Sequence, residues 1–505
     1  MIEIPVVVHV ITSGDGTEGF VPESTVRQQI DVLNAAFVSP NPSSSTPSYE
    51  FKIVALGYTA SDVYFERYRS NPESEAMRQD LSIDPSRVLN FYINKIPGTG
   101  VGGYASLPIS YDEDDPLHAV VVDFDFLPGG ADPDNNAGDV GVHEVGHYLG
   151  LYHTFHGGPD CCTTGDFVAD TNPHCNGLNC GSPTLPCGGQ VPPKENYMNY
   201  ADDSCLDNFT SGQFTRKREQ TAGYRPTLAF SSWDEIHLAD GLTVGSNQSY
   251  TFFDVDVKVG AGEQIVVNGG TLDAIDTRFL DLDTSQGWDG IRYNQNATGT
   301  LTRATVRDAS GIGVRVYKAD VDFVDTQITD SGSHGLSVYG NGSEAYFRGT
   351  TPGSAFLEDN GGNGAYAGNL GELYIENTSI RENSQNGVAA YKGDVFIAES
   401  IVTENGTNAG ANGHYGANGL FLGTINFGIP GPPYLGDNFF NNNQAGTLRA
   451  RSNSFFDAEA NLNDANHLNQ FLQTGSQRHV RADAADILAE CNWWGDPQGA
   501  VLGPV

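Results

Sequence analysis

Residues 143–153, which read HEVGHYLGLYH, contain a pattern that could bind a metal ion and use it for hydrolysis. His143 and His147 are four residues apart, so on a helix both imidazoles lie on one face and can reach one metal. Gly150 can end that helix in a left-handed conformation, so that the chain turns and brings in His153 as a third ligand. Three neutral nitrogen ligands leave the fourth position of a zinc ion open for water, as catalytic zinc sites require.

Glu144 lies next to the first histidine, where it can contact the zinc-bound water rather than the metal. Zinc lowers the pKa of that water toward about 7, and Glu144 can take its proton as general base. The alternative is a chance pattern, which would need three histidines and a glutamate at these spacings in a chain with only 12 histidines. We therefore expect a hydrolytic zinc site.

The composition limits the classes to which the chain can belong. With 505 residues the chain is too long for one ordinary hydrophobic core, and its 38% of hydrophobic residues suffice for the cores of two or three domains. The formal net charge of −37 argues against nucleic acid or an anionic membrane surface as a partner, because both need basic patches. No apolar segment is long enough for membrane insertion. No signal peptide is visible, so we interpret the chain as a mature or trimmed form.

Six of the seven cysteines follow the histidine cluster, between residues 161 and 205. A zinc ribbon would need two paired CxxC knuckles, which this segment lacks. Disulfide bonds that hold a loop-rich segment fit better, and they predict an oxidising, extracellular compartment. Cys491 has no partner in its part of the chain, and we expect it to be a free, buried thiol. The clustered cysteines are Cys161, Cys162, Cys175, Cys180, Cys187 and Cys205.

The first 225 residues are predicted to form an α/β (α+β) domain, in which both strands and helices position the histidines. Apolar runs predict strands, and apolar residues at helical spacing predict helices. From His153 to about residue 196 the chain is rich in Gly, Pro, Asn and Cys, a loop that is tolerable only if functional or cross-linked. The predicted strands are 4–11, 51–56, 88–93 and 119–126, and the predicted helices are 24–37 and 138–152.

The remainder, 226–505, is predicted to be an all-β domain. Short tetrapeptides recur as GIRY at 290, GVRV at 313, GLSV at 335, GAYA at 364, GVAA at 387 and GLFL at 419. A base period of 22 to 23 residues indicates a solenoid, here a right-handed parallel β-helix, rather than an antiparallel sandwich with closer strands. Near the end, Trp493 and Trp494 could plug the last coil or form a sugar-stacking platform.

The extended motif HExxHxxGxxH resembles the metzincin clan of metalloproteases. That clan has a methionine turn below the zinc, which NYMNY at 196–200 supplies with Met198. The resemblance gives Tyr200, two residues further on, the role of stabilising the tetrahedral intermediate. GDFVADTN at 165–172 and FTSGQ at 209–213 narrow the resemblance to the pappalysin family (cytophagalysin and ulilysin type), over roughly residues 3–225.

This resemblance implies a zinc endopeptidase with calcium and two disulfides in the loop region. Asp166 and Asp170 are the candidate calcium ligands, although both could simply form turns. Cys205 is expected to pair with Cys175 or Cys180, and Cys187 with Cys161 or Cys162. Some family members cut before arginine or lysine through an acidic residue just before the last cysteine. That position is Ser204 here, so the preference is not inferred.

The segment Gly98–Pro108 is the candidate edge strand along which a peptide substrate would bind by strand addition, with a surface loop as the alternative. The leading expectation is a secreted endopeptidase that hydrolyses peptide bonds by Glu-assisted attack of zinc-bound water. The β-helix is expected to be a binding or spacer module, with polysaccharide or cell-surface material as its candidate partners. The competing classes are an adhesin or carbohydrate-binding protein and a polysaccharide-degrading enzyme centred on the β-helix.

Overall fold

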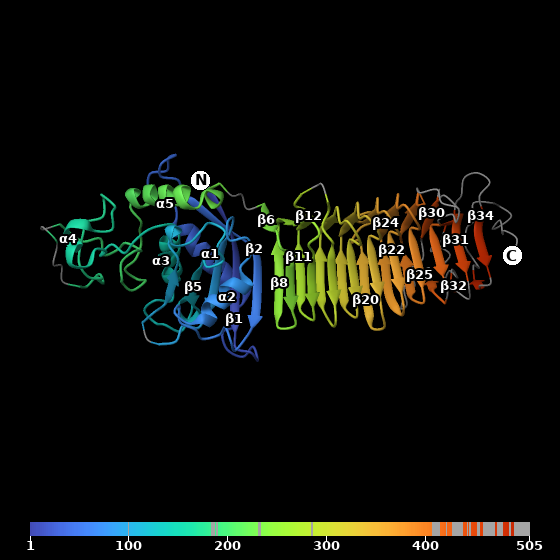
Figure 1. Ribbon diagram of the computed structural model, residues 1–505, viewed down its shortest axis with the longest axis horizontal. Coiled ribbons are helices and arrows are strands. Elements are labelled where there is room, and N and C mark those ends of the chain that lie inside the picture. The colour runs from blue at the N-terminus through green and yellow to red at the C-terminus, as the bar shows by residue number, and fades with distance from the viewer. Residues whose placement is uncertain are drawn as a thin grey trace. The chain divides into compact units, whose positions relative to one another are not determined.

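The computed structural model describes residues 1–488 except 99, 183–186, 188–189, 231–233, 284–285, 407–414, 421, 427–437, 442, 444–445, 452–454, 458–469, 472–477 and 484–485. The chain divides into two compact units, Met1–Ile236 and His237–Val505 (Figure 1). Each unit is built on parallel strands, in two different architectures. Across these described ranges, no helix has the length and apolar character needed to cross a membrane.

The N-terminal unit contains a mostly parallel sheet with strands in the order β2-β1-β3-β5-β4. Only β4 runs antiparallel to its neighbour, and it forms an edge of the sheet. The strand that precedes the zinc-motif helix, predicted over 119–126, ends early because the Asp123 carboxylate accepts a hydrogen bond from Asp125 N and starts a 3₁₀ turn. The strands are β1 (Ile2–Thr12), β2 (Tyr49–Ala60), β3 (Leu89–Asn94), β4 (Gly103–Ala105) and β5 (Val120–Asp123).

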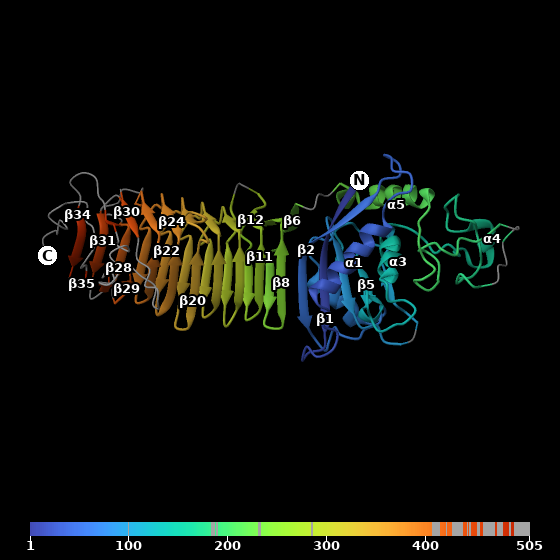
Figure 2. The same ribbon diagram turned by 180° about the vertical axis from the view of Figure 1, so that it is seen from behind.

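Helices α1 and α3 pack together beside this sheet, and α3 contacts both β4 and β5 (Figure 2). The predicted helices at 24–37 and 138–152 are confirmed as α1 and α3, and α3 ends sooner because Gly150 takes the expected left-handed conformation, with φ +104°. The helices are α1 (Glu23–Ala36), α2 (Pro72–Leu81), α3 (Asp139–Tyr148), α4 (Cys161–Thr164), α5 (Ser211–Tyr224) and α6 (Pro226–Ala229), with 3₁₀ turns η1 (Pro108–Ser110), η2 (Phe124–Phe126) and η3 (Gly158–Asp160).

The core of this unit lies between the sheet and its helices. Strand β1 is buried along almost its whole length, as expected for a parallel strand covered on both faces. From α3, Val142, Val145 and Tyr148 turn fully buried side chains toward this core. The helix that carries the zinc motif is therefore held by apolar packing on one side, which leaves its histidine face for the site.

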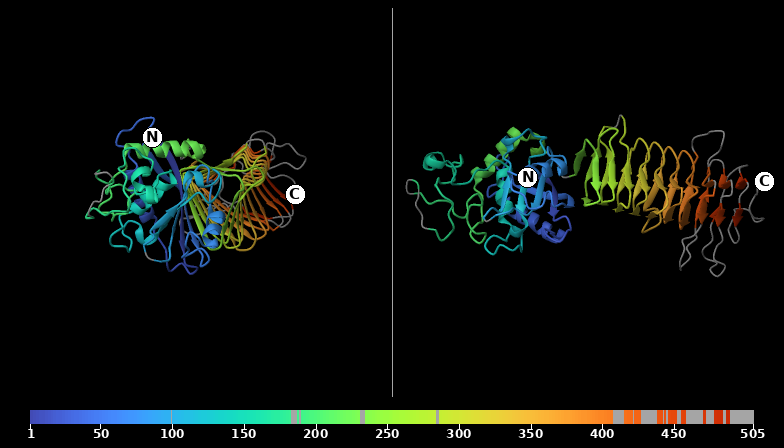
Figure 3. Two further views of the ribbon diagram at one scale, coloured as in Figure 1. Left: turned by 60° about the vertical axis from the view of Figure 1, so that its left-hand side comes forward. Right: turned by 60° about the horizontal axis from the view of Figure 1, so that its bottom comes forward.

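The second unit is a parallel β-helix in which each coil supplies one strand to each of three sheets (Figures 1 and 3). Strand β6 (Glu235–Leu238) contains the boundary between the units. One sheet holds β8 (Gln248–Phe253), β11 (Thr271–Ile275), β14 (Thr298–Thr302), β17 (Asp320–Val324), β20 (Ser343–Arg348), β23 (Gly371–Glu376), β26 (Asp394–Ala398), β29 (Thr424–Asn426), β32 (Phe455–Asp457) and β35 (Asp486–Leu488).

The second sheet carries the tetrapeptide repeats: β7 (Leu242–Gly245), β10 (Ile265–Asn268), β13 (Ile291–Asn294), β16 (Val314–Tyr317), β19 (Leu336–Tyr339), β22 (Ala365–Gly368), β25 (Val388–Tyr391), β28 (Ala417–Leu420), β31 (Gly446–Arg451) and β34 (Arg478–Asp483). The third holds β6, β9 (Asp256–Val259), β12 (Arg278–Asp281), β15 (Thr305–Arg307), β18 (Gln327–Thr329), β21 (Ala355–Glu358), β24 (Thr378–Arg381), β27 (Ile401–Thr403), β30 (Phe439–Asn441) and β33 (Gln470–Phe471).

Each tetrapeptide repeat begins with glycine because successive coils approach one another closely at that position. A Cβ on Gly335 would lie 2.8 Å from the carbonyl oxygen of Gly364, and one on Gly364 would lie 2.9 Å from that of Gly387. The register also corrects the last repeat: Val388 pairs with Ala417, so the repeat glycine is Gly416 rather than Gly419. Strand pairing, not the local letters GLFL, sets that position. Cys491, Trp493 and Trp494 lie outside the described residues.

Candidate active site

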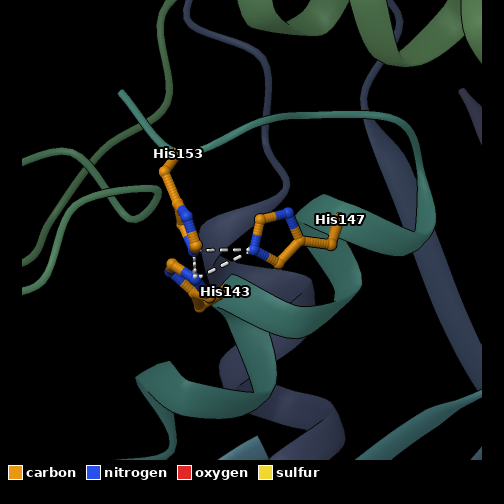
Figure 4. A group of neighbouring side chains, drawn as sticks. All are labelled: His143, His147 and His153. Atoms are coloured by element: carbon orange, nitrogen blue, oxygen red, sulfur yellow. Dashed lines mark hydrogen bonds between the residues drawn. The ribbon is translucent and has the colours of Figure 1, made fainter. Parts of the chain in front are cut away.

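The three histidines of the motif converge on one point (Figure 4). His143 and His147 project from one face of α3, and His153 comes from the chain after the Gly150 turn. The three Nε2 atoms lie 3.0 to 3.1 Å from one another. One zinc ion bonds imidazole nitrogens at about 2.0–2.1 Å, so a single ion can reach all three. The donor set therefore fits zinc.

The opposite ring nitrogens set which nitrogen faces the metal position. His143 Nδ1 lies 2.6 Å from the carbonyl oxygen of Tyr197, and His147 Nδ1 lies 2.8 Å from that of Leu151. A carbonyl can only accept, so each Nδ1 donates and each Nε2 presents its lone pair. Burial lowers the pKa of His143 well below its usual value, that of His147 to about 4 and that of His153 to about 3. All three rings are neutral near pH 7, the form that binds metal.

Helix α1 and the segment around the methionine turn hold the start and the underside of α3. Asp203 accepts a hydrogen bond from Ala137 N at 2.7 Å, immediately before the helix, and Gln29 Nε2 donates to the carbonyl of Gly138 at 2.9 Å. Met198 is fully buried and contacts α3 at Gly146, where any Cβ would collide with its sulfur. The methionine turn therefore lies directly beneath the zinc helix, and a glycine is needed in the helix to admit it.

Glu144 is 7% exposed and packs against the edge strand β4, where a Cβ on Gly103 would lie 2.7 Å from its Cγ. Burial raises the pKa of Glu144 to about 8, and the positive charge of Arg69 opposes that rise. A buried carboxylate with a high proton affinity is suited to accepting a proton from water. Glu144 therefore lies between the histidines and the edge strand β4.

Tyr200 borders the histidine cluster and is 59% exposed. Its ring centroid lies 4.7 Å from that of His153 and 5.7 Å from that of His143, and Phe155 packs against it at 4.9 Å. The Tyr200 ring therefore packs against the histidine cluster and remains accessible to solvent.

Two cavities flank the cluster, and their charges differ. One, of about 380 Å³, follows Gly100 to Gly103 and is lined by Asp139, Asp202 and Asp203. Burial and then the neighbouring Asp203 raise the pKa of Asp139 to about 7. The other, of about 350 Å³, follows Gly103 to Leu107 and is lined by Arg69, Tyr152 and His156. Glu144 and Tyr200 line both, so the two cavities form the two sides of one cleft.

The clustered cysteines form three disulfide bonds, Cys161–Cys175, Cys162–Cys187 and Cys180–Cys205. The expected pairing of Cys205 with Cys175 or Cys180 and of Cys187 with Cys161 or Cys162 is confirmed, but the expected total of two is wrong. Cys161 and Cys162 are adjacent in the short helix α4, where neighbouring side chains point in directions about 100° apart. Each therefore reaches a different segment of the loop.

The two aspartates predicted to bind calcium have different surroundings. Asp166 is buried, and its Oδ2 has no hydrogen-bond partner in the described part of the chain. Burial raises the pKa of this carboxyl to about 6. Asp170 accepts hydrogen bonds from Thr210 Oγ1 at 2.7 Å and Gly212 N at 2.8 Å, at the start of α5. The structure thus leaves an uncompensated carboxylate oxygen only on Asp166 of this pair.

Sequence reasoning did not identify four charged residues of the cleft, which are Arg69, Asp139, Asp202 and Asp203. Asp139 lies one helical turn before His143, so its spacing could have placed it on the same face. Asp202 and Asp203 lie just past the methionine turn, immediately before Ser204. Arg69 comes from the loop before α2, and no local pattern connects it with the zinc motif.

The HExxHxxGxxH site on this α/β scaffold defines a metzincin-type metalloprotease. Residues 73–222 match the peptidase M43 family, which is described as pregnancy-associated plasma protein-A. An extracellular metalloprotease of Colletotrichum graminicola is 34% identical over 224 residues, which cover 43% of this chain and 76% of the relative. One of Neurospora crassa is 31% identical over 231 residues, covering 44% and 76%. The chain belongs to this peptidase family, the pappalysins.

Among solved structures, mature mirolysin of Tannerella forsythia in complex with a cleaved peptide is similar to this chain. The two are 25% identical, and the match covers 46% of this chain and 96% of mirolysin with a TM-score of 0.39. The family membership identifies the protein as a metalloendopeptidase.

Proposed function

We propose that this protein is a secreted zinc endopeptidase that cuts extended peptides bound along β4. The observation that carries the proposal is the convergence of three Nε2 atoms within 3.1 Å of one another, beside the buried carboxylate of Glu144. Secretion is supported by the three disulfide bonds and by relatives that are named extracellular metalloproteases.

His143, His147 and His153 would hold the zinc ion. Bound there, zinc would acidify a water molecule and polarise the substrate carbonyl. Glu144 would take the proton from the attacking water and pass it to the departing amine, since both transfers need one group beside the scissile bond. The Tyr200 hydroxyl would donate a hydrogen bond to the oxygen on which negative charge develops.

Substrate binding is proposed to use the free edge of the sheet. Strand β4 (Gly103–Ala105) has β5 on one side, and the backbone groups on its other side can pair with an extended peptide. Because Gly103 abuts Glu144, pairing along β4 would bring the peptide backbone next to the catalytic carboxylate.

The direct test is digestion of casein and of internally quenched peptides by the purified full-length chain. We expect internal cleavage, read from the termini of the products by mass spectrometry, and no release of uronic acid from acidic polysaccharides. Release of uronic acid without peptide cleavage would instead support the competing proposal of an enzyme centred on the β-helix.

We also propose a calcium ion at Asp166, because a buried carboxylate oxygen without a partner is costly unless a cation compensates it. Asp170 already bonds the start of α5 with both oxygens, so its part in a calcium site rests on the family resemblance alone.

The β-helix is proposed to be a spacer or binding module. One of its sheets presents a row of four carboxylates in register, since Asp320 pairs with Glu344, Glu344 with Glu372, and Glu372 with Asp394. Such a row would repel polyuronates and other anionic polymers. The competing function, degradation of acidic polysaccharide, is therefore disfavoured on this sheet, and neutral or cationic surface material fits it better.

If catalysis belongs to the N-terminal unit alone, a fragment should keep it. The fragment should end at residue 236 rather than 225, because Leu228 of α6 is fully buried and Thr227 bonds Glu113. We expect residues 1–236 to hydrolyse small peptides within about twofold of the full chain, since each unit has its own core. A soluble, zinc-loaded but inactive fragment would show that the β-helix helps to form the site.

A further inference from the structure

Arg69 is a charged residue in the cleft for which the mechanism above has no use. It lines the cavity that follows β4 from Gly103 to Leu107, together with His147 and Tyr152. The side chain is exposed, and it makes no hydrogen bond or ion pair within the described part of the chain. The nearby Arg67, in contrast, donates to the carbonyl oxygens of Glu66 and Asp62.

Arg69 lines the same cavity as Glu144 and Tyr200, so its positive charge lies beside the catalytic centre. The chain has 63 acidic and 26 basic residues. Without an ion pair in the described part of the chain, Arg69 gives its side of the cleft a positive potential, although the protein as a whole is acidic. A planar guanidinium can bind a carboxylate through two parallel hydrogen bonds.

The direction of β4 decides which part of a substrate would meet Arg69. The acidic cavity flanks the start of β4, and the Arg69 cavity flanks its end. A peptide that adds antiparallel to β4, the more stable pairing and the one that β4 already makes with β5, runs from the Arg69 cavity toward the acidic cavity. Its residues before the scissile bond then lie over Arg69, and those after it lie over Asp139 and Asp203.

We propose that Arg69 is a specificity-determining residue that selects an aspartate or glutamate among the three substrate residues preceding the scissile bond. The inference rests on the proposed peptidase function and adds a substrate class to it. The opposite cavity strengthens the selection, because Asp139, Asp202 and Asp203 would repel a carboxylate placed on the other side of the bond. Substrates bound in the wrong register would therefore be penalised.

The test uses the full-length zinc-loaded protein and matched quenched peptides. They carry glutamate, glutamine or lysine at one of the three positions before the cleavage site and are otherwise identical. At the position that reaches Arg69, we expect kcat/KM for the glutamate peptide to exceed that for the glutamine peptide by about tenfold, and the lysine peptide to be slower still. Added salt should shrink this preference, because the pair is exposed to solvent.

Substitutions at the arginine separate selection from a general role. Arg69→Gln should slow only the glutamate peptide, bringing it level with the glutamine peptide, and Arg69→Glu should reverse the order in favour of lysine. Arg27→Gln is the matched control, since Arg27 is an exposed arginine on α1 that pairs with Glu23. It should leave all three rates unchanged.

Two results would overturn the inference. One is equal cleavage of the three peptides by the parent protein at every position. The other is a loss in Arg69→Gln that is the same for all peptides and moves the pH profile, which would make Arg69 a positioning residue for Glu144. If the parent protein cleaves no peptide at all, the proposed peptidase function is wrong, and the inference about Arg69 is wrong with it.

Discussion

Replacing Glu144 with alanine is expected to lower kcat/KM for peptide hydrolysis by about a thousandfold or more while the zinc stays bound. The three ligands come from other residues, so their Nε2 atoms remain within 3.1 Å of one another. What is lost is the group that moves the proton from the attacking water. The substitution also removes a buried carboxylate from beside Gly103, so the variant should be at least as stable as the parent.

Tyr200→Phe is the matched comparison for this variant. It deletes one hydroxyl from an exposed ring and should cost about tenfold to a thousandfold in kcat, as expected for one donor to a developing oxyanion. The measurements are kcat and KM on a quenched peptide, with zinc content determined on the same samples. A Glu144→Ala protein as active as the parent would refute the role assigned to Glu144.

Removing the zinc ion should abolish activity entirely and reversibly. We expect one tightly bound zinc per chain by elemental analysis, loss of peptide cleavage with a strong chelator, and recovery when zinc is returned. His153→Ala should lose most of its zinc, because it deletes one of three neutral nitrogen donors. The same elemental analysis reports whether calcium is present, as proposed for Asp166.

The control for the ligand variant is His156→Ala. His156 follows His153 by one short turn and stacks on Tyr152 at 4.3 Å, outside the three-histidine cluster. It should keep its zinc, so a difference between the two variants reports coordination rather than the general loss of a histidine. Protein that still cleaves peptides while containing no zinc would contradict the metal assignment.

Much of the site could be predicted because its ligands are close in sequence. His143 and His147 lie one helical turn apart, and Gly150 supplies the left-handed turn that returns His153, so three ligands depend on the eleven residues 143–153. The β-helix was predictable for a similar reason. Its strands repeat with a base period of 22 to 23 residues that insertions lengthen in places, and the glycine of each repeat is required by the carbonyl of the next coil.

What the sequence by itself determined is therefore the chemistry of the motif and the periodic half of the chain, because both depend on local geometry. Only the tertiary structure decided which distant residues complete the cleft. Arg69, Asp139 and Asp203 meet there because the sheet order places β4 at an edge and the methionine turn beneath α3. The disulfide bond that had not been expected, Cys161–Cys175, and the register of the repeat at Gly416 were likewise set by long-range packing. Such contacts leave no periodic trace in the sequence, because each joins segments brought together only by folding.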